Sequence, residues 1–324
     1  MTRFLLRSIL ALTVACGGLL AGLAACRTLD GTGSAPVPAF IASMRFLGQP
    51  GEPKTEYNLP RVVTLCGETL PLNRPSVYER LDREFQLAAN HRAQVELWRR
   101  RAIRYFPLIE RSLRDAGLPD DLKYLAVAES DLRPTVSSPA GATGLWQFMP
   151  ATARHFGLKV TRQEDFRMLP EPLLAIGMKY LSQLHSRFGS WALAMAAYNS
   201  GEARVDQALA RESAGADYYQ LKLPTETERY VYRIAAIKII LENAERFGFG
   251  DTPPSGLYKP LEFTETTLSF STPTSWAQLA KERGVDYKTL RLLNPHLGAM
   301  NVLSGGPFIF RLPPGAKAVP KVGA

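Results

Sequence analysis

The sequence predicts a mainly α-helical protein that ends in a small α+β unit. Apolar residues recur at steps of three and four over long stretches, which is the period of an amphipathic helix. No convincing strand alternation appears between about residues 90 and 248. Beyond Phe249 the pattern changes to strand, helix, helix, strand. The 324 residues, of which 46% are hydrophobic, suffice for about two domains with ordinary cores.

The first 25 residues have the composition of a secretory signal. Arg3 and Arg7 precede an uncharged apolar run that ends at Leu23-Ala24-Ala25-Cys26. This order resembles a bacterial lipobox, in which the cysteine is lipidated and the chain is cut before it. We expect removal of residues 1–25 and attachment of the mature protein through Cys26, with an ordinary signal peptide or an uncleaved anchor as alternatives. Arg27 is not the aspartate that holds many lipoproteins at the inner membrane, which favours the periplasmic side of an outer membrane.

A tether is predicted over residues 26–75. Up to about Pro60 the chain is rich in Gly, Pro, Ser and Thr and shows no sustained period. Cys16 leaves with the signal and Cys26 is acylated, so Cys66 is the only thiol expected in the mature chain. No disulfide can then form within it.

The first long helices are expected between residues 76 and 116. One apolar stripe runs at steps of four, four, three and four: Trp98, Ala102, Phe106, Ile109 and Leu113. Pro107 should kink or restart the helix, because proline cannot donate the backbone hydrogen bond. Gly117 and Pro119 then close one helix and open the next.

Four later helices complete the helical region over residues 76–248. They are predicted at Pro150–Phe156, Pro172–Phe188, Trp191–Tyr198 and Thr225–Phe247. Gly189 stops the second of them, and Thr225 with Glu228 has the spacing of a capping box at the start of the last.

The C-terminal unit is predicted over residues 257–315, after a turn-rich linker at 249–256. Two strands and two helices are expected in it: Leu261–Phe270, Trp276–Arg283, Tyr287–Leu293 and Phe308–Leu312. Residues 316–324 have the composition of a loose tail.

The pattern of reactive residues does not favour metal or cofactor chemistry. The four histidines are scattered, the cysteines are too few for a zinc site, and the common nucleotide and serine-nucleophile motifs are missing. We expect no metal and no cofactor. The balance of 39 Lys and Arg against 30 Asp and Glu favours an acidic partner such as nucleic acid, anionic lipid or a carboxylate-bearing wall polymer.

One carboxylate is placed for acid catalysis. Glu129 follows Leu122, Leu125 and Ala126 by seven, four and three residues, so it emerges on the apolar face of its helix. It also lies at the C-terminal end of that helix. Both circumstances disfavour the ionised form and suit a general acid at neutral pH. The alternative is a surface glutamate that pairs with Arg133 or Arg154.

Four motifs within residues 119–232 resemble those of one enzyme family. They are Glu129-Ser130 with Pro134 and Ser138, Gly141-Ala142-x-Gly144-Leu145-Trp146-Gln147-Phe148-Met149-Pro150, Ala197-Tyr198-Asn199-Ser200-Gly201, and Glu226-Thr227-Glu228-Arg229-Tyr230-Val231. Their order and spacing resemble the soluble-lytic-transglycosylase catalytic domain, the lysozyme-like domain of bacterial murein lyases. With the lipobox and the C-terminal unit, the chain is similar to membrane-bound lytic murein transglycosylases of the D type.

The resemblance implies a lyase that cleaves the bond between N-acetylmuramic acid and N-acetylglucosamine and leaves a 1,6-anhydro end. Glu129 would act as acid and then as base. A retaining double displacement needs two carboxylates about 5 Å apart, whereas Asp131 should face away from Glu129 on a helix. A mechanism with a single carboxylate is therefore expected.

The resemblance also implies residues that hold the saccharide. They are Ser138, Gln147, Tyr198, Asn199 and Tyr230, while the alternative for Ser138 is a turn residue before Pro139. Trp146, Phe148 and Met149 are expected in the core or in the wall of the groove. Tyr232 stands where many relatives have proline.

The C-terminal unit resembles a degenerate LysM repeat, a glycan-binding fold, without the usual Gly-Asp-Thr-Leu opening. Its alternative role is a structural cap. The implied partners are peptidoglycan strands and, through the lipid, a membrane; nucleic acid is not expected. Two other functions stay open: a muramidase that delivers water to the same bond, and an inactive wall-binding lipoprotein.

Overall fold

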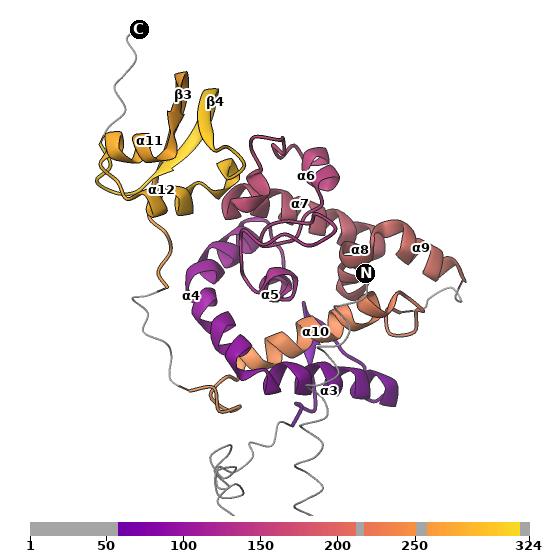
Figure 1. Ribbon diagram of the computed structural model, residues 1–324. Helices are drawn as coiled ribbons and strands as arrows, with labels where there is room; N and C mark the ends of the chain where they lie inside the picture. The colour runs from indigo at the N-terminus through magenta and orange to yellow at the C-terminus, as the bar shows by residue number, and fades with distance from the viewer. Residues whose placement is uncertain (1–57, 212–216, 251–257, 318–324) are drawn as a thin grey trace, which may run out of the picture. The chain divides into compact units, whose positions relative to one another are not determined.

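Helices form most of the chain that the structure, a computed structural model, describes, namely residues 58–211, 217–250 and 258–317 (Figure 1). These residues belong to one unit that spans residues 55–324. The predicted fold class, mainly α with a small C-terminal α+β unit, is confirmed. Within the described ranges, no helix is long and apolar enough to cross a membrane. The predicted signal, Cys26 and most of the predicted linker and tail lie outside these ranges.

The predicted tether over residues 26–75 is too long. Strands β1 (Thr64–Leu65) and β2 (Glu68–Thr69) pair antiparallel. Three apolar side chains around them are at most 4% exposed and join the main core: Val63, Leu65 and Leu70. The Glu68 carboxylate also accepts the main-chain N–H groups of Trp191 and Ala192. So short a hairpin has no apolar period that the sequence could show.

The first two long helices are α3 (Pro75–Asn90) and α4 (Arg92–Asp115). The break lies at His91, with φ −88° and ψ 58°. Pro107, where we expected a kink or a restart, lies inside α4. The carbonyl group that loses its helical partner belongs to Ile103, which is only partly buried, so the helix can continue past the proline.

Eight further helical segments complete this region: η3 (Asp120–Leu122), α5 (Lys123–Ser130), α6 (Pro150–His155), η4 (Phe166–Met168), α7 (Pro170–Phe188), α8 (Trp191–Ser200), α9 (Glu202–Arg211) and α10 (Thr225–Glu242). Helix α9 was not predicted. Gly201 has the features of a helix end, but its φ of 87° marks only a one-residue break between α8 and α9.

The predicted capping box at the start of α10 is wrong. Pro224 is the N-cap, and no side chain caps the helix there. The Glu228 carboxylate instead accepts the N–H of Leu223 at 3.2 Å. Helix α10 also ends at Glu242, earlier than the predicted Phe247.

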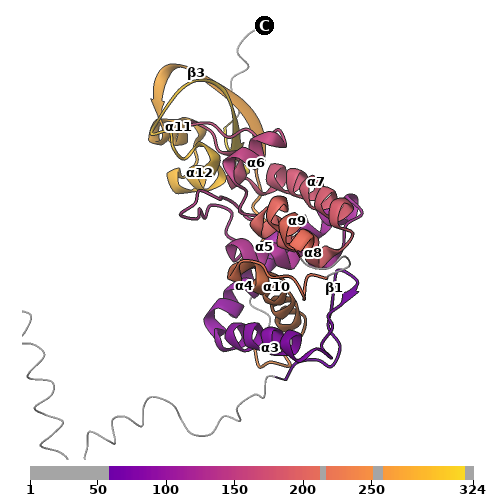
Figure 2. The ribbon, with the colours of Figure 1, turned by 90° about the vertical axis from the view of Figure 1, so that its right-hand side faces the viewer.

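Helix α5 lies in the middle of this region, in contact with both α4 and α10, and α10 runs beside α3 (Figures 1 and 2). One hydrophobic core extends from β1 to the end of α10, and it includes Leu81, Ile109, Leu125, Trp146 and Tyr230. A helix of eight residues is marginal by itself, so this packing holds α5 in place.

The C-terminal unit comprises β3 (Thr264–Ser275), α11 (Trp276–Arg283), α12 (Tyr287–Leu293), η5 (Pro295–Leu297) and β4 (Val302–Leu312). Both helices begin and end at the predicted residues, whereas the strands are longer than predicted. The strands pair antiparallel, with Thr264 opposite Leu312 and Ser275 opposite Val302. Trp276, Leu290 and Phe310 belong to a second, separate core.

Candidate active site

Helix α5 ends in a turn that fixes the position of Glu129. Asp131 and Leu132 both have left-handed backbone angles, with φ of 55° and 57°. The chain therefore leaves the helix just after Glu129, which is partly buried, and Leu132 returns into the core. Arg133 lies 3.4 Å from the Asp131 carboxylate, and Arg154 contacts the Val160 carbonyl, so neither takes the role of the predicted alternative partner.

Tyr230 of α10 is the hydrogen-bond partner of Glu129. Its hydroxyl donates to Oε1 of the carboxyl group, and its side chain is only 1% exposed. The two residues are 101 positions apart in the sequence. The structure thus brings together the first and the last of the four motifs.

Burial is the main reason that the pKa of Glu129 rises, from 4.5 to about 7. The hydrogen bond from Tyr230 and the positive charge of Arg233 oppose this rise, and the negative charge of Glu226 adds to it. Arg233 is itself paired with Glu226 at 2.7 Å. At neutral pH a large share of Glu129 is therefore protonated and able to give up a proton.

The loop between α5 and α6 is held by its own polar side chains. Gln147 has a left-handed φ of 48°, and its Nε2 donates to the carbonyl groups of Val136 and Gly144 at 3.0 and 2.9 Å. Ser138 Oγ accepts the N–H of Ala142 at 3.1 Å, which is the role of a turn residue. Both side chains predicted to meet saccharide thus also stabilise the loop that carries them.

A cavity of about 310 Å³ opens beside this loop. Its lining includes three predicted residues, Gln147, Tyr198 and Asn199. The Tyr198 hydroxyl donates to the Trp146 carbonyl at 2.5 Å, and Asn199 Oδ1 accepts the hydroxyl of Thr227 at 2.8 Å. Trp146 is buried in the core. Phe148, which is also buried, and Met149, which is 43% exposed, both line the cavity.

Two further residues of this cavity were not predicted. Tyr180 of α7 and Glu202 of α9 also line it, and they interact with each other through a hydrogen bond. Glu202 directly follows the motif Ala197–Gly201, so the sequence could have indicated that it lies near the site. Tyr180 has no such signal, because it belongs to the regular pattern of a long helix.

Arg167 also holds this loop in place, a role that no motif in the sequence indicated. Its side chain is buried, and Nη1 donates to the carbonyl groups of Gly141 and Phe148 at 2.7 and 2.8 Å. Asp165 accepts from Nε and Nη2. Gly144 packs so tightly here that a Cβ atom would lie 2.0 Å from the Arg167 carbonyl oxygen. A side chain at position 144 would therefore displace the loop.

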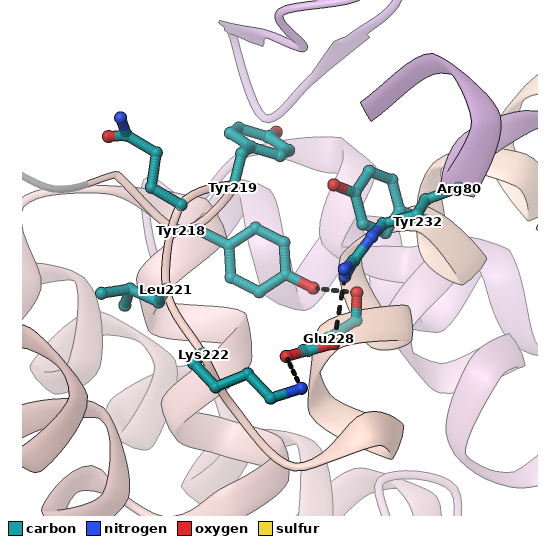
Figure 3. A pocket seen from close by; sticks show the side chains of 8 residues that line it. Arg80, Tyr218, Tyr219, Leu221, Lys222, Glu228 and Tyr232 are labelled. Atoms are coloured by element: carbon teal, nitrogen blue, oxygen red, sulfur yellow. Dashed lines mark hydrogen bonds and ion pairs between the residues drawn. The ribbon is translucent and has the colours of Figure 1, made fainter. Parts of the chain in front are cut away.

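A second, smaller cavity of about 130 Å³ is lined by residues of α3, α10 and the segment before α10 (Figure 3). Glu228 lies in it, paired with Lys222 at 3.0 Å and Arg80 at 3.1 Å. Burial opposes ionisation of Glu228, but its hydrogen bonds and these cations outweigh it and lower the pKa. Tyr232, at the position where relatives often have proline, is buried against this cavity. The second cavity therefore holds a charged carboxylate rather than an acid.

Comparison with known proteins shows what the helical region is similar to. Residues 106–221 match the model described as "Transglycosylase SLT domain". The chain is 31% identical over 217 residues to membrane-bound lytic murein transglycosylase D of Escherichia coli K12. This alignment covers 66% of this chain and 47% of that relative. It is 36% identical over 121 residues to soluble lytic murein transglycosylase of Salmonella typhimurium LT2, with 35% and 19% covered.

Among solved structures, the 70 kDa soluble lytic transglycosylase SLT70 of Escherichia coli matches 67% of this chain and 41% of that chain. The identity is 22% and the TM-score is 0.40. The chain spans about half the length of the first curated relative. The resemblance that the four motifs predict is confirmed by the domain match and by that relative.

Proposed function

The chain carries a transglycosylase SLT domain at residues 106–221, and on this premise we propose that it is a peptidoglycan lytic transglycosylase. It cleaves the β-1,4 bond between N-acetylmuramic acid and N-acetylglucosamine and leaves 1,6-anhydromuramic ends. The observation that carries the proposal is the partly buried carboxyl group of Glu129, hydrogen bonded to Tyr230 and with a pKa raised to about 7.

Glu129 acts first as an acid. Its proton passes to the oxygen between the two sugars as the bond from that oxygen to the anomeric carbon breaks. The N-acetyl group of muramic acid stabilises the positive charge that develops at this carbon. The ionised carboxylate then accepts the proton of the muramyl 6-hydroxyl as its oxygen bonds to the anomeric carbon, so water is not consumed.

A second carboxylate is not required for this sequence of steps. Asp131 Oδ1 accepts the indole N–H of Trp98 at 2.8 Å, and Glu226 is paired with Arg233. Glu202, the carboxylate that lines the saccharide cavity, is hydrogen bonded to Tyr180. These three acids thus each have another partner. This supports a mechanism with one carboxylate over a double displacement that uses two.

The 310 Å³ cavity is proposed to hold the saccharide. Glu129 is not among the residues that line it, but Tyr198, which lines it, is close enough to Glu129 for the two to interact electrostatically. Tyr198 and Asn199 end an otherwise apolar helix and present polar groups there. Gln147 lines the same cavity, and its Oε1 is suited to accept from a hydroxyl or acetamide group. Ser138 contributes by shaping the loop.

Outside the described residues, we propose that Cys26 is lipidated and holds the enzyme at the periplasmic side of an outer membrane. The C-terminal unit, with its strand, helix, helix, strand order, is proposed as a LysM-like unit that gives a second attachment to glycan.

Mass analysis of digested sacculi tests the proposed reaction. The wild type should release muropeptides with 1,6-anhydromuramic ends, and Glu129→Gln should be slower by at least about a hundredfold, because it lacks the proton. Glu79→Gln, an exposed position on α3, is the matched control. Reducing muramic ends would instead indicate a muramidase, and no cleavage by the folded wild type would indicate a wall-binding protein.

A further inference from the structure

A third cavity, of about 340 Å³, lies where the helical region meets the C-terminal unit. One side is formed by α4, the segment after α5 and the start of α7. The other side is formed by residues 258–263, α12 and β4. The volume is in the range of small-ligand sites.

Positive charge dominates the walls of this cavity. Four arginines line it against a single carboxylate, Glu171, which is paired with Arg311 at 2.8 Å. Arg101 and Arg104 donate to the main-chain oxygens of Asp131 and Lys259, both at 2.9 Å. A main-chain oxygen has no net charge, so these contacts orient the guanidinium groups without neutralising them.

Arg133 adds a third positive charge at the mouth of the cavity. Its side chain is half exposed, Nε donates to the Ser130 carbonyl at 3.2 Å, and the Asp131 carboxylate lies 3.4 Å away. That carboxylate is shared with Trp98, so it offsets the charge of Arg133 only in part. The cavity therefore favours an anion.

The remaining wall is largely apolar. Leu132 and Tyr105 are buried in it, whereas Leu261 and Leu292 are exposed by 37% and 60%. A small inorganic anion would leave these groups in contact with water. An acidic ligand with short aliphatic groups satisfies both parts of the wall.

The cavity is close to the proposed acid along the chain. Leu132 is three residues after Glu129, so the two Cα atoms lie within about 11 Å of each other. In peptidoglycan the muramic acid at the cleaved bond carries a short peptide stem with several free carboxylates and alanine methyl groups. This stem has the charge and the aliphatic groups that the cavity requires.

We propose that this cavity binds the acidic peptide stem of the strand that is being cleaved, with Arg104, Arg133 and Arg101 as the carboxylate-binding groups. The proposal rests on the proposed function. It assigns recognition of the peptide stem to a site that is lined by residues 132–135 and shares no lining residue with the saccharide cavity.

Direct binding tests the site without reference to catalysis. A synthetic acidic stem tripeptide is titrated into the full chain by calorimetry, beside the same tripeptide with its carboxylates amidated. The acidic peptide should bind more tightly by at least about tenfold, and Arg104→Gln should remove about tenfold of its affinity, the value of one charge-assisted hydrogen bond. Arg111→Gln, an exposed position on the same helix, is the matched control. Equal binding of the two peptides, or equal losses in the two variants, overturns the proposal.

Turnover gives the second measurement. The ratio of kcat/KM on stem-bearing glycan to kcat/KM on amidase-stripped glycan should fall by about tenfold in Arg104→Gln and in the exposed Arg133→Gln. An unchanged ratio in both folded variants contradicts the site. If the wild type forms anhydro ends from stripped glycan, the proposed function stands, whatever value the ratio takes. If it forms none, the proposed function fails, and the peptide titration still tests whether the cavity binds the stem.

Discussion

Glu129 and Glu228 make a useful comparison, because one contacts helix α10 through Tyr230, the other belongs to that helix, and the two carboxylates have opposite chemistry. Glu129 contacts one uncharged donor, the hydroxyl of Tyr230, and its pKa rises to about 7. Glu228 contacts Lys222 and Arg80, and its pKa falls (Figure 3). Burial acts in the same direction on both.

The comparison shows that burial alone does not make a general acid. A carboxyl group in a dry site is neutral only when no cation is close enough to repay the lost hydration of the charge. Arg233, the cation that lowers the pKa of Glu129, is itself paired with Glu226. The neighbouring charges therefore decide which of the two carboxylates can do acid chemistry.

The largest expected difference is between Glu129→Gln and Glu228→Gln. The first should lose at least about a hundredfold in activity and remain folded. The second should keep its activity and lose about 1 kcal/mol of unfolding free energy, because Lys222 and Arg80 lose their partner. Anhydromuropeptide release and chemical denaturation measure the two effects. Loss of activity in the folded Glu228→Gln variant would remove the distinction between the two sites.

Tyr230→Phe should change the pH dependence of kcat/KM. The Tyr230 hydrogen bond stabilises ionised Glu129 and lowers its pKa, so its removal should move the alkaline limb of kcat/KM to higher pH. A loss of about tenfold in rate is expected from the missing hydrogen bond. Tyr232→Phe, beside the Glu228 cavity, is the control and should leave the limb in place. If the alkaline limb does not shift in Tyr230→Phe, the Tyr230 hydrogen bond does not set the pKa of Glu129.

Arg167→Lys should weaken substrate binding and leave the pKa of Glu129 unchanged. Lysine cannot reach both the Gly141 and Phe148 carbonyl groups with the geometry of a guanidinium group, so the loop beside the saccharide cavity should loosen. We expect KM to rise by about fivefold with the pH midpoint unchanged. The exposed Arg162→Lys is the control. A shifted midpoint would show that Arg167 acts on Glu129 as well.

The smallest expected effect is on thermal stability. The folded pKa of Glu129, about 7, lies above the ordinary value of 4.5. Its contribution to stability is therefore complete below pH 4.5 and is lost as the pH rises through about 7. Glu129→Gln lacks this loss, so its Tm relative to wild type should increase by a few degrees between about pH 5 and pH 8. Scanning calorimetry at about pH 5 and pH 8 measures this change in Tm, and the control Glu79→Gln should show no such trend.

Helices with local signals were the most predictable part of the fold. Helices α11 and α12 match the prediction to the residue, because Ser275 and Asp286 cap them through the N–H groups of Gln278 and Thr289, three residues later. The hairpin at residues 64–69 and the pairing of Arg167 with Phe148 were not predictable. The hairpin is too short to show an apolar period, and Glu68 meets Trp191, 123 residues later in the chain. Arg167 and Phe148 are 19 residues apart, and no period marks their contact.

The sequence by itself placed Glu129 on the apolar face at the end of a helix, because helical period and helix ends depend on neighbouring residues. Four local motifs also predicted the resemblance to the transglycosylase SLT domain, whose model residues 106–221 match. Only the tertiary structure decided that Tyr230, 101 residues away, donates to that carboxyl group, and that Gln147 and Ser138 hold their own loop. Hydrogen-bond partners and desolvation depend on which atoms meet in space, and this is a property of the packed chain rather than of any one segment.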